Sequence, residues 1–156
     1  MSRIGFVAIA IASLLVTLRA QSSDPRLTVG DVEKVTGMKN LQLLAPGAVP
    51  GAGAGLNFAT AERKMILMVN FGPAALYSRA KAQKEYAGLP MVLFHAAVPG
   101  VGDEAFDSPP GPLQYVLYVR KGANAASFTA YYVSPNKATL TMDQLKQIAK
   151  VAVTRM

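Results

Sequence analysis

Apolar and polar positions repeat with two periods along the chain, and the clearest helical repeat lies near the C-terminal end. Thr141 precedes this repeat and Gln144 follows three residues later, which is the pattern of a capping box. The spacing therefore predicts an amphipathic helix that begins after Thr141 and buries one stripe. The stripe consists of Met142, Leu145, Ile148, Ala149 and Ala152.

Two further segments predict helices. In residues 28–37, Thr28 is placed to cap the first turn, and Gly37 can adopt the left-handed conformation that ends a helix. Val32, Val35 and Met38 form its expected buried stripe.

Residues 74–87 follow Gly72-Pro73, and proline is tolerated at a first helical position. The expected buried face contains Leu76, Ala80, Gln83 and Ala87, with Tyr77 beside it. Lys81 and Glu85 are spaced to pair on the solvent side.

Strand patterns fill most of the remaining chain. Residues 113–120 alternate, with Leu113, Tyr115, Leu117 and Val119 on one side and Gln114, Val116, Tyr118 and Arg120 on the other. Short connections predict two hairpins. The expected strands are 40–45, 56–60, 65–71, 91–98, 113–120 and 125–133.

This order predicts an α+β protein in which a mainly antiparallel sheet of about six strands is covered by three helices. The elements are expected as one helix, three strands, a second helix, three strands and a third helix.

The N-terminal segment has the pattern of an export signal. Arg3 precedes an uncharged apolar run over residues 4–18, and Ala20 precedes a polar stretch. We therefore expect a signal peptide over residues 1–20, a single domain over 21–156, and a periplasmic or secreted product. The alternative is that residues 4–18 are retained as a membrane anchor.

Composition narrows the classes of partner. The chain has no cysteine, which excludes disulfides and a lipid-modified N-terminal cysteine. Removing Arg3 and Arg19 from the 16 basic residues leaves 14 against 9 acidic ones, a net charge of +5. This charge favours an anionic small or polymeric ligand, or an envelope protein, as partner. No nucleic acid is expected, and membrane contact is expected only if residues 4–18 are retained.

Few residue types that carry chemistry are present. His95 is the only histidine and lies in an apolar segment, so neither a metal set nor a cysteine nucleophile is available. The glycines of residues 46–55 lead into a strand and not a helix, which is unlike a phosphate-binding loop. We expect no cofactor, no metal and no catalytic residue. The alternative is a small hydrolase-like enzyme that uses Asp103, Glu104 and His95 together.

The stretch VPGVGDEAFDSPPG, residues 98–111, places two adjacent carboxylates between glycines and a proline-rich segment. Gly100 and Gly102 allow a tight bend, and Asp103 is then placed to accept hydrogen bonds from loop amides. The chain is expected to re-enter the sheet at Ala105 and Phe106.

Aromatic side chains populate both faces of the second hairpin. Cross-strand packing accounts for most of them. If one face lacks a covering helix, Tyr118, Tyr131 and Arg120 would form an amphipathic binding patch. The candidate ligand-binding residues are Asp103, Glu104, Tyr118, Arg120 and Tyr131.

Three motifs carry a resemblance: LTVGDVEKVTG, GVGDEAF and YVLYVRKG. With them the chain resembles a group of small exported bacterial proteins of unknown function, which share a T-x-x-D-V helix and a G-x-G-D-E-A-[FY] turn. The order of elements is also similar to that of the PsbP-type α/β/α sandwich. Both resemblances imply a binding or accessory role and supply no catalytic residues. We therefore expect an exported, non-catalytic accessory protein of the cell envelope.

Overall fold

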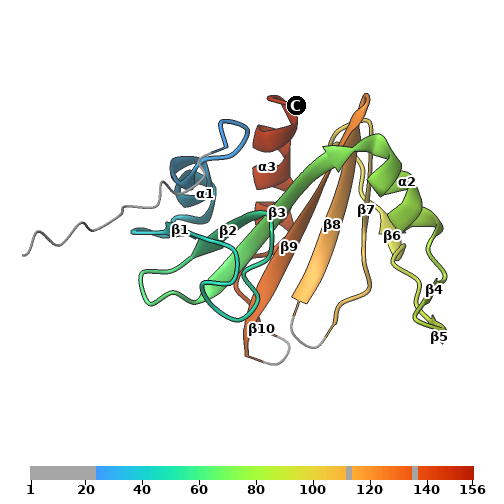
Figure 1. The fold of residues 1–156 in the computed structure, drawn as a ribbon. Helices are drawn as coiled ribbons and strands as arrows, with labels where there is room; N and C mark the ends of the chain where they lie inside the picture. Colours follow the sequence, from blue (N-terminus) through green and yellow to red (C-terminus); the bar gives the residue numbers. More distant parts are fainter. Residues whose placement is uncertain (1–23, 112–113, 135–136) are drawn as a thin grey trace, which may run out of the picture.

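The structure is a computed structural model of the chain, and it describes residues 24–111, 114–134 and 137–156. The predicted signal peptide, residues 1–20, lies outside the described residues. In the described part, three helices accompany an antiparallel sheet (Figure 1). The helices are α1 (Val29–Thr36), α2 (Ala74–Ala82) and α3 (Met142–Val153).

The main sheet follows the strand order β1-β2-β3-β9-β8-β7-β6, and β10 pairs with β9. Every pairing is antiparallel. A separate hairpin joins β4 to β5. The strand bounds are β1 Gln42–Leu44, β2 Leu56–Ala59, β3 Met65–Pro73, β4 Glu85–Tyr86, β5 Leu89–Pro90, β6 Ala96–Ala97, β7 Glu104–Asp107, β8 Gln114–Lys121, β9 Asn124–Ser134 and β10 Lys137–Ala138. The predicted α+β class, a mainly antiparallel sheet with three helices, is confirmed.

One face of the sheet packs on α1 and α3. The alternation of β8 turns Tyr115, Leu117 and Val119 to this face, where all three are buried. The apolar stripe of α3 lies against them, and its Leu145 and Ile148 are fully buried. The predicted stripe of the third helix is therefore confirmed, and the main core lies between this face and the helix pair.

The predicted N-terminal caps of α1 and α3 and the predicted glycine end of α1 are present in the structure. Thr28 forms a capping box with Asp31, and Thr141 forms one with Gln144. Gly37 ends α1 with a φ of 74°, in the left-handed region. Local side-chain hydrogen bonding therefore fixes where both helices begin.

The opposite face of the sheet is covered at one end by α2 (Figure 1). Tyr77 and Ala80 pack against Phe106 and Ala125 in a second, smaller core. The predicted buried face of this helix is correct for Ala80, with Tyr77 beside it, and wrong for Leu76, which is 46% exposed. It also fails for Gln83 and Ala87, because α2 ends at Ala82 and these positions cannot continue its stripe.

The predicted strand 91–98 is also wrong over most of its length. Only Ala96–Ala97 pairs with the sheet, as β6, whereas Met91, Val92 and Phe94 are exposed. The position beside β8 is taken by β7, where the chain re-enters the sheet after the glycine turn. With that position occupied, residues 92–94 have no partner among the described strands. The number of strands after α2 exceeds the three expected.

The glycine-rich loop 46–55 is held in place by hydrogen bonds. The buried side chain of Asn57 donates to the carbonyl oxygens of Gly53 and Gly55 and accepts from the Gly53 amide. Tyr131 donates its hydroxyl to the carbonyl oxygen of Gly51 at 2.8 Å. The loop therefore lies against the end of the sheet that carries Tyr131.

Candidate functional site

The turn before β7 brings two carboxylates to the closed end of the β8–β9 hairpin. Gly100 and Gly102 have φ values of 77° and 63°, which confirms the predicted bend. A Cβ atom at position 102 would lie 2.5 Å from the carbonyl oxygen of Arg120. Only glycine therefore lets the turn approach β8 this closely. Ala105 and Phe106 re-enter the sheet as expected.

Asp103 is fixed by the hairpin turn. Its Oδ2 accepts the Gly122 amide at 2.7 Å, and its Oδ1 accepts from Lys121 Nζ at 2.8 Å. The amide hydrogen bond, followed by the lysine, lowers the pKa of the Asp103 carboxyl. This carboxylate therefore holds one turn against another and is ionised at neutral pH.

Glu104 connects three elements. It lies opposite Arg120 in the β7–β8 register and accepts from Arg120 Nη2 at 2.8 Å. Its second oxygen accepts from Lys81 Nζ of α2 at 3.1 Å. Arg120 first, and then Lys81, lower the pKa of the Glu104 carboxyl. The predicted Lys81–Glu85 pair is therefore wrong, because Lys81 pairs with Glu104 of β7.

His95 takes part in a different contact. Its Nδ1 lies 3.2 Å from Asp107 Oδ1, which also accepts the Ala96 amide at 2.8 Å. In the described part of the chain, no hydrogen bond joins any two of Asp103, Glu104 and His95. A general acid needs a carboxyl that holds its proton near neutral pH, which neither lowered pKa provides.

An open cavity of about 460 Å³ lies between the turn and α2. The rings of Tyr77 and Phe94 form part of its wall, and each packs against the buried ring of Phe106. Lys81 Nζ lies 5.8 Å from the centre of the Tyr77 ring and 6.0 Å from that of Phe94. Residues 97–105, which include Asp103 and Glu104, complete the lining.

Of the other predicted binding residues, Tyr118 is close to this cavity and Tyr131 is not. Tyr118 stacks on Phe106, with ring centres 4.7 Å apart and an angle of 18°, and its burial raises the pKa of its phenol. It lines a second open cavity, of about 560 Å³, whose wall also includes Met91 and Val92. Tyr131 contacts the loop 46–55 at the far end of the hairpin. The structure therefore brings together Asp103, Glu104 and Arg120 and separates Tyr131 from them.

The aromatic and basic side chains of the first cavity, Tyr77, Phe94 and Lys81, were not predicted as site residues. Lys81 was predicted to pair with Glu85, the carboxylate four residues further on. Phe94 lies in an apolar run and was predicted to belong to a strand. Tyr77 was expected beside a buried face, which did not distinguish a core residue from a cavity wall.

The described residues contain no group of three or more potential metal-ligating side chains arranged around one point. Nor is any helix in the described ranges long and apolar enough to span a membrane. Fold and site together define an α+β protein with an aromatic surface cavity beside a glycine turn. The chain matches no protein-family model, no curated protein and no solved structure. The two resemblances found in the sequence therefore stay predictions.

Proposed function

We propose that this chain is an exported accessory protein of the cell envelope that binds a ligand or partner and catalyses no reaction. The observation that supports the proposal most strongly is the cavity between α2 and the glycine turn. Its volume of about 460 Å³ falls within the range of small-molecule sites, and its aromatic walls are typical of them.

The charges at the cavity indicate what kind of ligand it takes. Lys81 and Arg120 share the single carboxylate of Glu104, while Asp103 is already paired with Lys121. The ion-paired cluster of Lys81, Arg120, Lys121, Asp103 and Glu104 therefore carries a net charge of +1 beside the cavity, and Lys81 is its cation next to the rings of Tyr77 and Phe94. This arrangement favours a small anion with an apolar or aromatic body.

The same ion pairs argue against catalysis. Asp103 and Glu104 each hold cations and hydrogen-bond donors, and a reaction that used them would first have to break those contacts. His95 is paired with Asp107 and is absent from the cavity lining. Binding therefore fits this arrangement better than proton transfer.

The proposal is tested by expressing the full chain in a bacterium with a periplasm and recovering the periplasmic product. Export predicts a mass that lacks residues 1–20. The product is then titrated with the anionic aromatic dye 8-anilinonaphthalene-1-sulfonate, whose fluorescence rises on binding. We expect saturable binding that weakens about tenfold in Phe94→Ser, because an exposed aromatic wall of the cavity is lost.

Val92→Ser is the matched control, since Val92 is also exposed and apolar but lines only the second cavity. It should leave dye affinity within about twofold of the unmodified protein. Dye binding that responds equally to both substitutions, or turnover of an ester or glycoside substrate that disappears in Glu104→Gln, would contradict the proposal.

A further inference from the structure

The exposed large apolar side chains of the described residues all lie in one stretch of the chain. Four of them, Tyr86, Leu89, Met91 and Val92, follow α2 directly and are named the apolar tip here. Tyr86 and Leu89 are 67% and 69% exposed, which is far more than packing against a core allows. Such clustering of apolar side chains in water marks a contact surface.

The backbone holds these side chains in a defined arrangement. In the β4–β5 hairpin, Tyr86 lies directly opposite Leu89, and the Met91 amide donates to the Lys84 carbonyl oxygen at 2.9 Å. Ala87 and Gly88 form the turn with φ values of 51° and 78°, both left-handed, as in the tightest hairpin turns. Figure 1 shows this hairpin beyond the edge of the main sheet.

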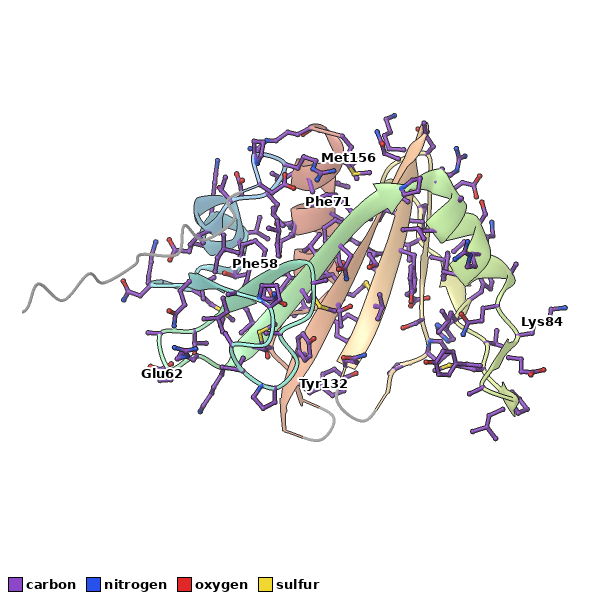
Figure 2. All side chains as sticks on the ribbon, viewed as in Figure 1. Phe58, Glu62, Phe71, Lys84, Tyr132 and Met156 are labelled. Atoms are coloured by element: carbon purple, nitrogen blue, oxygen red, sulfur yellow. The ribbon has the colours of Figure 1, made fainter. Side chains whose placement is uncertain are left out.

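Cations outnumber carboxylates in the segment that contains the hairpin. Residues 79–94 contain Arg79, Lys81 and Lys84 against the single carboxylate Glu85, a net charge of +2. Lys84, labelled in Figure 2, lies where the chain enters β4. Among the described residues, neither Arg79 nor Lys84 forms an ion pair. Cations at the base and apolar groups at the end match the layers of an anionic bilayer.

We infer that the apolar tip binds the surface of an anionic lipid bilayer, with Tyr86 and Leu89 among the headgroups and upper acyl chains and Arg79 and Lys84 on the lipid phosphates. A projecting hairpin with two residues in each strand offers little of the roughly 800 Å² per partner that a stable protein interface uses. A bilayer needs no shape complementarity, so a narrow tip is sufficient. The inference goes beyond the proposed function, because it does not use the cavity at the glycine turn.

The chain contains no tryptophan, so one introduced indole reports on its own surroundings alone. The test uses the full chain with Leu89→Trp and vesicles of phosphatidylcholine with or without 30% phosphatidylglycerol. We expect the emission to shift to the blue with the anionic vesicles and to be quenched by brominated acyl chains. Leu76→Trp is the control: Leu76 is 46% exposed but lies on α2 against Gly72, and its emission should not be quenched.

The charge contribution is measured on the Leu89→Trp background. Replacing Arg79 and Lys84 by glutamine should weaken vesicle binding about fivefold for each cation removed. In the protein that keeps both cations, 0.5 M NaCl should also weaken vesicle binding, because salt screens the attraction to the lipid. Lys64→Gln, in the distant β2–β3 turn, should change affinity by less than about twofold.

Three results would overturn the inference. One is unquenched Leu89→Trp emission with both vesicles, and another is equal quenching in the Leu76→Trp control. The third is a blue shift that depends on protein concentration without lipid, which would make the tip a contact between protein chains. Because Leu89 does not line the first cavity, dye binding in Leu89→Trp reports separately on the proposed function.

Discussion

Gly102 determines how close the candidate site comes to the sheet. Its left-handed φ places Asp103 and Glu104 on the end of the β8–β9 hairpin, where Gly122, Lys121 and Arg120 meet them. The sequence predicted this bend from Gly100 and Gly102, which allow a tight turn. It did not predict the hydrogen-bond partners, because those lie about 18 residues further along the chain and depend on the register of β7 with β8.

Gly102→Ala should therefore destabilise the fold more than Gly100→Ala. Both substitutions place alanine in the left-handed region, which costs about 1–2 kcal/mol. At position 102 the new Cβ would also lie 2.5 Å from the Arg120 carbonyl oxygen, whereas at position 100 it meets nothing within 4 Å. We expect a loss of about 3 kcal/mol against about 1 kcal/mol in the free energy of unfolding from urea denaturation. Equal losses would show that the close approach of turn and strand is absent.

At the scale of elements, the two capped helices are fastened to one another. Arg155, just beyond α3, donates to both carboxylate oxygens of Asp31 in α1, at 2.7 and 3.1 Å. Asp31 also accepts from the Thr28 amide and hydroxyl. Arg155, followed by the Thr28 amide and hydroxyl, holds the pKa of the Asp31 carboxyl far below its usual range.

Asp31→Asn should lower the free energy of unfolding by about 1–2 kcal/mol at pH 7. A carboxyl whose pKa is lower in the folded than in the unfolded protein stabilises the fold at a pH above its unfolded pKa. This stabilisation is lost as the pH falls towards the pKa of the folded protein. The difference between the two proteins should therefore shrink below about pH 4. Asp143→Asn is the control: Asp143 is 88% exposed and should matter by less than about 0.5 kcal/mol. A difference independent of pH would contradict the ion pair.

Elements that are determined by a local sequence pattern were predicted better than elements that depend on a neighbouring strand. The caps of α1 and α3 and the alternation of β8 are local patterns, and they were predicted correctly. The segment 91–98 has the composition of a buried strand, but it can form a strand only where the edge of another strand is available for pairing. Since β7 occupies the place beside β8, no local pattern could show that Met91, Val92 and Phe94 stay exposed.

At the scale of the molecule, the two faces of the sheet differ. One is closed by α1 and α3 over the main core, and the other is covered only in part by α2 and the loop 46–55 (Figure 1). Both proposed binding surfaces lie at the α2 end, where the chain passes from α2 through the β4–β5 hairpin to β6. The cavity takes its wall from Phe94, and the apolar tip takes its side chains from the same stretch.

Amide hydrogen exchange followed by NMR tests most directly whether this stretch is an exposed surface. Met91 and His95 donate to backbone oxygens, but in the described part of the chain the amides of residues 92–94 do not. We predict that the amides of residues 92–94 exchange within minutes, while amides in the β8–β9 ladder are protected for hours or longer. Protection of residues 92–94 equal to that of β8 would mean that they are paired in a strand, which would contradict the exposed stretch from which the cavity takes Phe94.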